Sequence, residues 1–275
     1  MKIQFPECIT AENSEKYNLT IRLWAGGFAF SGFIPDEEGS FFYETASLDL
    51  NISYIDSLKN IFFENECMKY MYKSLNVMCV TDKYTIVPGD VYLEKGKEEL
   101  LSFCTSPTEN CKIISQGIEN KNYIILFELD SEVYEFLVRS FVNVNFAHFL
   151  SPMLKVWQEN NLETFPKHIY VNVQKGIIDI VCFEHGDLIF SNSFRCEKDN
   201  DLLYFVIYVF KQLGFNQLED NLFFCGETFV CNSVIDVLKT YFEHITLLSK
   251  KMKKYKIPVD QDIPYDIIKL TECGL

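Results

Sequence analysis

Several common functional signatures are missing from this chain of 275 residues. Its ten cysteines include no CxxC pair, and its four histidines do not stand at zinc-ligand spacings beside them. A structural zinc site and a disulfide framework are therefore not indicated. The motifs GxSxG, GxxxxGK[ST] and GxGxxG are also absent, which argues against a serine-hydrolase elbow, a P-loop and a dinucleotide-binding loop.

Long apolar segments are missing too. The opening residues, MKIQFPECIT, lack an apolar core of secretory length, and the longest apolar run, Leu202–Phe210, is far shorter than a membrane span. Cys79, Cys182 and Cys225 lie in strand-like apolar runs. These features predict buried, reduced thiols in a cytoplasmic protein.

The composition supplies ample material for packed cores. Apolar residues make up 48% of the chain and aromatic residues 15%, which excludes a disordered chain, and the length allows one large domain or two smaller ones. The formal net charge of −14 makes nucleic acid an unfavourable main partner. The same charge is also what an ordinary soluble surface carries.

The second half of the chain gives the clearer pattern of elements. Turns at Gln174-Lys175-Gly176 and His185-Gly186-Asp187 separate three strand-like runs, as in an antiparallel meander. A helix over 199–213 follows and ends at Gly214. The predicted elements are strands 169–173, 177–183 and 188–194, helix 199–213, strand 221–225, a helix capped by Asn232 or Ser233, and strand 244–248.

The first half repeats this order more loosely. It predicts strands 19–24, 28–33 and 41–48, helix 54–63, strand 74–81, a helix starting at Ser131, strand 142–149 and a helix starting at Ser151-Pro152. Residues 81–130 interrupt the order. We interpret them as an inserted subdomain or as an elaborated sheet edge.

Three strands, a helix, a strand, a helix and a strand form the ribonuclease H-like order, and here the order occurs twice. We therefore predict an α/β fold with mixed sheets, in which two tandem ribonuclease H-like subdomains give an actin-like ATPase architecture. The first subdomain is expected over 1–163, with the insertion at 81–130, and the second over 164–275. Helix 199–213 is apolar on nearly every side, so we expect it to be covered on more than one side. An interface between the halves or between subunits would cover it, and deep burial on a single sheet is the alternative.

A basic cluster and a tail end the second subdomain. Five lysines lie between Lys250 and Lys256, and this cluster is either a solvated stretch or a dock for an acidic partner. Residues 264–268 are predicted to be extended and to be held against the body by Tyr265, Ile267 and Ile268.

Four segments resemble the bacterial family named domain of unknown function 3822. They are LTIRLWAGGFAFSGF, YTIVPGDVYLE, HIYVNVQKGIIDIVCFEHGDLIFSNSF and NDLLYFVIYVFKQLG. The resemblance runs from about Leu19 to Leu248. It implies a fold similar to that of actin-like ATPases and, more distantly, of the cytoplasmic pilus and secretion assembly proteins in that superfamily. It implies no established activity or substrate.

An actin-like ATPase needs a strand-borne aspartate for its metal, and small residues that let backbone amides reach phosphate. The expected positions read Arg22-Leu23-Trp24-Ala25-Gly26-Gly27 and Asn172-Val173-Gln174-Lys175-Gly176. Neither contains an aspartate, and Trp24 is bulky where a small residue is wanted. The glycines Gly26, Gly27 and Gly176 are interpreted as hairpin residues that need positive φ, with phosphate binding as the alternative.

The remaining candidate positions are weak in the same way. The turn after the strand 221–225 holds one glycine, Gly226, followed by the acid Glu227, which would disfavour an anionic ligand. Asp179 is the single carboxylate near the second hairpin, and one acid cannot supply a metal site alone. A ribonuclease H-type nuclease fails for the same reason, because its two metals need converging carboxylates.

Two hypotheses follow from these positions. The first is a non-catalytic binding or scaffolding protein that needs no cofactor and holds a protein partner, as a monomer or homodimer. The second is an atypical nucleotide-binding protein or ATPase that uses ATP with Mg in a cleft between the subdomains. The candidate positions for either are Trp24, Gly26, Gly27, Asn172, Lys175, Gly176, Asp179, Gly226 and Glu227.

Overall fold

The structure is a computed structural model in which two compact units are distinguished. It describes residues 6, 9–49, 51–106, 108–118, 122–159, 167–174, 176–226, 232–252, 255 and 262–273. Unit 1 consists of residues 1–152, 252–263 and 270–275, and unit 2 of residues 153–251 and 264–269. Each unit is described by itself below.

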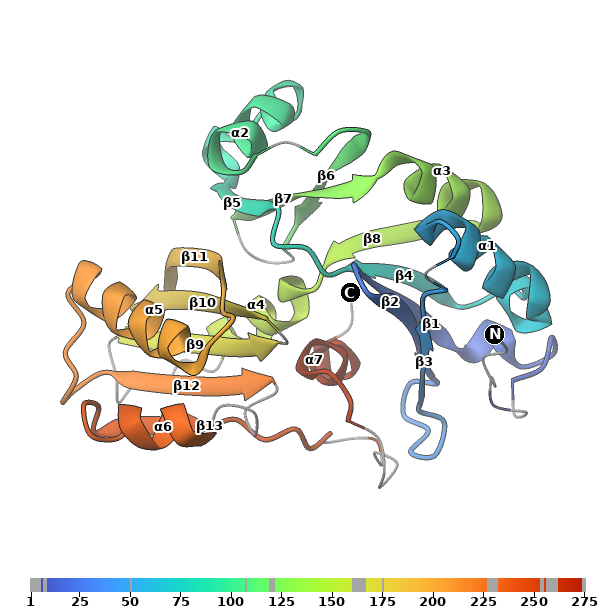
Figure 1. The fold of residues 1–275 in the computed structure, drawn as a ribbon. Coiled ribbons are helices and arrows are strands. Elements are labelled where there is room, and N and C mark those ends of the chain that lie inside the picture. Colours follow the sequence, from blue (N-terminus) through green and yellow to red (C-terminus); the bar gives the residue numbers. More distant parts are fainter. Residues whose placement is uncertain are drawn as a thin grey trace. The chain divides into compact units, whose positions relative to one another are not determined.

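Unit 1 is built on a five-stranded sheet in the order β3-β2-β1-β4-β8 (Figure 1). The strands are β1 (Asn18–Trp24), β2 (Gly27–Phe33), β3 (Phe42–Ser47), β4 (Ser74–Cys79) and β8 (Val144–His148). The first three are antiparallel, whereas β4 runs parallel to β1 and β8 parallel to β4. All seven residues of β2 are buried, which explains why that strand reads as a continuous run of apolar and small residues.

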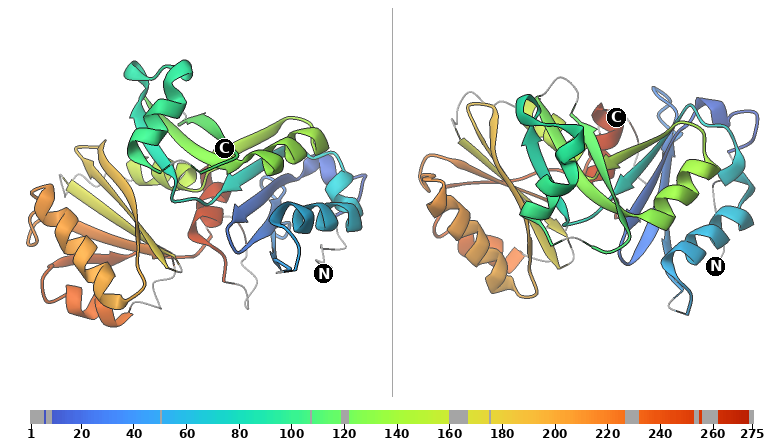
Figure 2. Two further views of the ribbon diagram at one scale, coloured as in Figure 1. Left: turned by 45° about the horizontal axis from the view of Figure 1, so that its top comes forward. Right: turned by 90° about the horizontal axis from the view of Figure 1, so that it is seen from above.

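Two helices lie side by side in unit 1 (Figure 2). The first, α1 (Tyr54–Glu64), begins at Ser53, whose Oγ accepts from the backbone N–H of Asp56 at 3.1 Å. The second, α3 (Ser131–Ser140), begins at Asp130. The rings of Phe62 and Phe136 join the two helices edge to face, with centroids 5.4 Å apart.

The stretch 81–130 contains a separate antiparallel sheet in the order β5-β7-β6. Its elements are β5 (Tyr84–Pro88), α2 (Lys97–Cys104), β6 (Cys111–Gly117) and β7 (Tyr123–Asp130). Val87, Leu101 and Leu126 form a small core of its own. Short 3₁₀ turns complete unit 1: η1 (Ser14–Lys16), η2 (Glu66–Lys69), η3 (Gly89–Val91) and η4 (Glu94–Gly96).

Unit 2 repeats the order with its sheet β11-β10-β9-β12-β13. The elements are β9 (Lys167–Gln174), β10 (Ile177–Glu184), β11 (Asp187–Arg195), α5 (Asp199–Gln212), β12 (Asn221–Gly226), α6 (Asn232–Leu238) and β13 (His244–Leu247). As in unit 1, the first three strands, β9, β10 and β11, pair antiparallel. Strand β12 then runs parallel to β9, and β13 runs parallel to β12. The predicted double ribonuclease H-like order is thus confirmed.

Helices α5 and α7 differ from what the sequence pattern alone suggests. Within the chain, α5 buries Leu202, Val206, Val209 and Phe210 but leaves Tyr204 60% exposed, so it is not deeply buried on every side, and coverage by a second subunit stays a prediction. Residues 264–268 were expected to be extended, yet they lead into a helix, α7 (Tyr265–Cys273). Its Tyr265, Ile267 and Ile268 are buried, as expected. The chain also forms α4 (Leu150–Glu159).

Candidate functional site

A pocket of about 410 Å³ opens in unit 1 where β1 and β4 end. This volume is in the usual range for ligand sites. The walls come from the end of β1, the start of α1, the end of β4 and the β6, β7 and α3 segments. The lining residues are Leu23, Trp24, Ala25, Ser53, Tyr54, Ile55, Cys79, Val80, Thr81, Cys111, Glu128, Leu129, Asp130, Glu132 and Val133.

Trp24 covers the turn between β1 and β2. A Cβ added to Gly26 would lie 3.3 Å from Nε1 of Trp24, and one added to Gly27 would lie 3.0 Å from Cζ2 and 2.6 Å from the carbonyl oxygen of Ala46. The guanidinium of Arg22 stands 5.5 Å from the centroid of the indole. The indole therefore covers the backbone of Gly26 and Gly27, which a smaller residue at position 24 would leave open.

The two glycines of this turn serve a different purpose from the one predicted. Positive φ angles are found at Gly176, at +79°, and at Gly226, at +81°, but not at Gly26 or Gly27. Gly27 is instead required for space, because the carbonyl oxygen of Ala46 on the neighbouring strand approaches its backbone closely, whereas a Cβ at Gly26 would meet only the indole of Trp24.

Tyr54 joins the pocket to the same turn. Its hydroxyl donates to the carbonyl oxygen of Gly27 at 3.1 Å, and its ring meets Phe28 edge to face at 5.6 Å. Burial raises the pKa of Tyr54 well above its usual value. The hydroxyl is therefore a neutral donor that fixes the wall of the pocket.

Among the described residues that line the pocket, three carry carboxylates and none is a lysine or arginine. Glu128 accepts from the backbone N–H of Thr108 at 3.3 Å and from its hydroxyl. Oδ1 of Asp130 accepts from the backbone amides of Glu132 and Val133 in the first turn of α3, at 2.9 and 3.0 Å, which caps that helix. Burial, and then the charges of Glu128 and Asp130, raise the pKa of the Cys111 thiol to about 11. Glu128 and Asp130 thus already accept hydrogen bonds, and their negative charge disfavours an anion such as phosphate in this pocket.

In unit 2, the candidate Asp179 is buried among hydrogen-bond donors. Its Oδ2 accepts from the side-chain amides of Asn172 and Gln174, each at 2.9 Å, and its Oδ1 accepts from the hydroxyl of Ser193 at 2.5 Å. Burial raises the pKa of Asp179 to about 6, although these three hydrogen bonds act in the opposite direction. A carboxylate held in this way has little left to offer a metal ion.

Gly226 lies next to this network because β12 pairs with β9. A Cβ on Gly226 would be 2.2 Å from the carbonyl oxygen of Val173 and 2.8 Å from Oδ1 of Asn172. The thiol of Cys225 donates to the same Asn172 oxygen at 3.5 Å. Asn172, Asp179 and Gly226 are therefore brought together in unit 2, as Trp24, Gly26 and Gly27 are in unit 1.

Two candidate positions, Lys175 and Glu227, lie outside the described residues. Within the described part of the chain, no group of three or more His, Cys, Asp or Glu side chains could hold a metal ion. The pocket acids Glu128, Asp130 and Glu132 were not among the candidates. The sequence signal was limited to Asp130, which stands just before the predicted helix start at Ser131, where a capping side chain such as aspartate is preferred.

The fold and the two strand-end sites define a protein of the actin-like ATPase fold. More specifically, the chain belongs to the family described as protein of unknown function (DUF3822), which matches residues 6–245. Among curated proteins, none matches the sequence significantly. No helix in the described residues is both long and apolar enough to cross a membrane.

Solved structures support the fold. A Bacteroides thetaiotaomicron protein described as having an actin-like ATPase fold and unknown function is 29% identical, with a TM-score of 0.83, covering 97% of this chain and 99% of its own. A chain from the PilM–PilN type IV pilus biogenesis complex is 8% identical, with a TM-score of 0.50, covering 84% of this chain and 88% of its own. At that identity the second likeness concerns the fold alone.

Proposed function

We propose that this protein is a non-catalytic, cytoplasmic binding protein that holds a protein partner in the pocket of unit 1. The observation that carries the proposal is the charge of that pocket. Three carboxylates line the pocket, from Glu128 and Asp130 on β7 and from Glu132 on α3, and its described lining residues include no lysine or arginine. These negative charges would repel the phosphates of a nucleoside triphosphate. Phosphoryl transfer instead requires cationic groups, such as lysine, arginine or a metal ion, around the phosphates.

The same pocket has the chemistry to hold a side chain of a partner protein. Its apolar wall includes Leu23, Ile55 and Val133, and its acidic residues lie on the β7 and α3 side. An apolar side chain with a neighbouring arginine or lysine would satisfy both parts, because the apolar group leaves water while the cation meets the carboxylates. The partner is therefore expected to present an apolar residue beside a basic one.

The arrangement in unit 2 supports the absence of catalysis. An actin-like ATPase relies on strand-borne carboxylates that hold a metal and its water. Here the strand-borne carboxylate of Asp179 already accepts three side-chain hydrogen bonds in a buried site. The free thiols of Cys67, Cys79, Cys182 and Cys225, all buried, support the proposed reducing, cytoplasmic location.

Calorimetry with MgATP at millimolar concentration tests the non-catalytic part of the proposal. We expect neither binding heat nor a change in melting temperature. One-to-one binding would overturn it in favour of an atypical nucleotide-binding protein or ATPase.

Fluorescence anisotropy with labelled hexapeptides tests the binding part. Peptides of alternating leucine and arginine should bind, and matched peptides with glutamate in place of arginine should not. Glu132→Lys should weaken binding about tenfold by reversing a charge in the pocket. Glu135→Lys is the matched control on the same helix, because Glu135 is not in the pocket and pairs with Arg139 at 2.8 Å. Equal loss in both variants would contradict the assigned site.

A further inference from the structure

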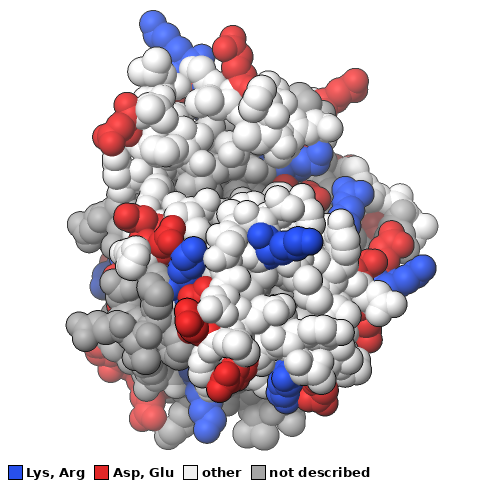
Figure 3. Space-filling view, turned by 90° about the vertical axis from the view of Figure 1, so that its left-hand side faces the viewer, with Lys and Arg blue, Asp and Glu red and all other residues white. Residues whose placement is uncertain are grey.

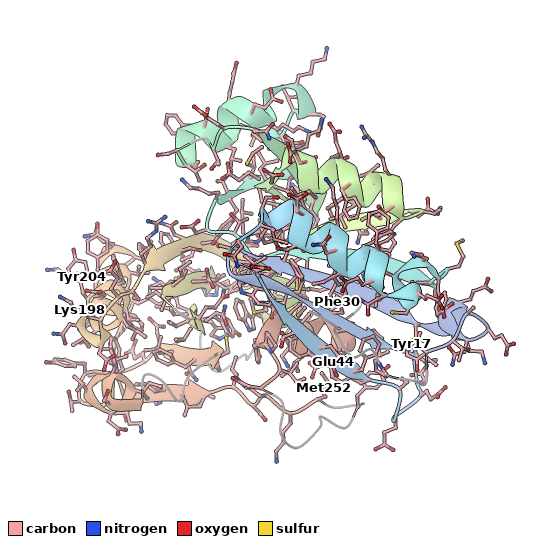
Figure 4. All side chains as sticks on the ribbon, turned by 45° about the vertical axis from the view of Figure 1, so that its right-hand side comes forward. Tyr17, Phe30, Glu44, Lys198, Tyr204 and Met252 are labelled. Atoms are coloured by element: carbon pink, nitrogen blue, oxygen red, sulfur yellow. The ribbon has the colours of Figure 1, made fainter. Side chains whose placement is uncertain are left out.

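The outer side of α5 carries two adjacent exposed aromatic rings. Tyr204 is 60% exposed and Tyr208 45% exposed, on the side opposite the buried Val206. The two rings stack on each other with centroids 5.8 Å apart and an interplanar angle of 18°. Figure 4 labels Tyr204 on the outer side of the helix. Figure 3 looks at the left-hand side of Figure 1, where α5 is drawn, and shows scattered charged residues among large uncharged areas.

Asp201, Tyr204, Tyr208 and Lys211 form one stripe along this helix. Their spacings of three, four and three residues place them within about 80° of arc, since each residue turns the helix by about 100°. The order is acid, tyrosine, tyrosine, base, and it is symmetric about position 206. A stripe of this kind is complementary to itself when reversed.

We propose that α5 is a homodimer interface, in which the α5 helix of a second copy packs antiparallel across this stripe. A two-fold axis near Val206 brings Tyr204 against the partner's Tyr208, and Asp201 against the partner's Lys211. Each contact then occurs twice, as an interface between identical surfaces requires. The charge pattern selects a second copy, because an unrelated partner would not need a symmetric stripe.

The side chains of the stripe are prepared for these contacts. The backbone amides of Glu197 and Lys198 donate to Oδ2 of Asp201 at 3.0 and 2.9 Å, so the carboxylate is held in place at the start of α5. Lys211 is exposed at the other end of the helix. The stacked tyrosines form a flat, partly ordered surface, which lowers the entropy cost of association.

The neighbouring helix α6 enlarges the surface. Val237 is 43% exposed and Tyr241, just beyond the end of α6, is 50% exposed. The hydroxyl of Ser233 donates to Asp199 at 3.1 Å, which ties the start of α6 to the start of α5. Because each copy carries a net charge of −14, long-range repulsion opposes the pairing, and we expect a dimer with a Kd on the order of micromolar.

Sedimentation velocity of the full chain over a concentration series at physiological salt tests the proposal. The wild-type protein should shift from monomer to dimer, and Tyr208→Arg should raise Kd more than about tenfold. Lys211→Glu on α5 should also lose the dimer. Lys59→Glu is its control, because it makes the same charge change on a different helix, α1 of unit 1. A wild-type protein that stays monomeric, or a dimer that survives Tyr208→Arg, overturns the interface.

A charge exchange tests the antiparallel pairing itself. Asp201→Lys and Lys211→Glu should each lose the homodimer, because like charges then face each other, and circular dichroism checks that both variants fold. An equimolar mixture should recover association, since both charge pairs are restored between one copy of each variant. Failure of the mixture to associate overturns the antiparallel pairing.

Discussion

The side-chain amide of Asn172 donates to Oδ2 of Asp179 across the β9–β10 pair, at a distance of 2.9 Å. The two residues were separate candidates for a phosphate or metal site. In the structure they satisfy each other in a buried network that Gln174 and Ser193 complete. The network gives the first prediction, because it holds a titratable group away from water.

Asp179→Asn should remove a pH dependence of stability. Burial raises the pKa of Asp179 to about 6 in the folded chain, whereas it is about 4 in the unfolded chain. Between those values the folded chain keeps a proton that the unfolded chain has released, so stability falls as the pH rises through that window. The variant has no such group, so its stability relative to the wild type should rise by about 2–3 kcal/mol between pH 4 and pH 7.5.

Urea denaturation of both proteins at matched pH values measures this difference. Burial lowers the pKa of His148 to about 3, so this residue destabilises both proteins as the pH falls below about 6.5. Its contribution cancels when the two proteins are compared at the same pH. A stability difference between the two proteins that stays constant from pH 4 to pH 7.5 would show that Asp179 titrates alike in the folded and unfolded chains.

Gly226→Ala should be among the most damaging single-methyl additions in unit 2. The new Cβ would lie 2.2 Å from the carbonyl oxygen of Val173, at a φ of +81°. Gly176→Ala is the matched control, with a φ of +79° but nothing within 4 Å of the new Cβ. We expect losses of about 3–5 kcal/mol for the first and about 1 kcal/mol for the second, by chemical denaturation. Equal losses would mean that backbone strain alone matters at Gly226.

The order of elements could be predicted because it is written in local patterns. Alternating apolar runs separated by turns such as His185-Gly186 mark strands regardless of what packs on them. Helix α7 was missed because residues 264–268 begin with a proline and form a short, mostly apolar run, for which extended and helical structures cannot be told apart from periodicity. The exposure of Tyr204 was missed because tyrosine is apolar enough to extend an apolar run and polar enough to face water.

The pocket could not be predicted from spacing. Its walls combine segments near Trp24, Tyr54, Cys79 and Glu128, which are far apart in the sequence and meet only through sheet pairing. The carboxylates come from β7 and α3, and β7 lies in the stretch whose strands β6 and β7 the sequence left unassigned. Local pattern identified Trp24 as unusual, but only the tertiary structure shows that it covers its own turn.

Trp24→Ala should leave the protein unable to bind MgATP. Removing the indole uncovers Gly26 and Gly27, yet the three pocket carboxylates remain and still repel phosphate. The same variant should bind the leucine–arginine hexapeptides more weakly, because it removes an apolar wall, and Trp24→Phe should keep most of the affinity. Calorimetry and anisotropy measure the two ligands. A gain of MgATP affinity in Trp24→Ala would show that the ring, and not the charge, excludes nucleotide.

Alkylation of thiols provides a direct measurement of the charge in the pocket. Cys104 on α2 is exposed, whereas Cys111 on β6 is half-buried and has a pKa raised to about 11 by burial and by Glu128 and Asp130. At pH 8 about one Cys111 thiol in a thousand is then the reactive thiolate.

Brief treatment with iodoacetamide, followed by peptide mass spectrometry, should therefore modify Cys104 well before Cys111. Glu128→Gln should speed the modification of Cys111, because it removes a neighbouring negative charge, while the rate at Cys104 serves as the internal control. Equal rates at Cys111 in the wild type and in Glu128→Gln would show that Glu128 does not act on this thiol, and the acidic character assigned to the pocket would lose its support.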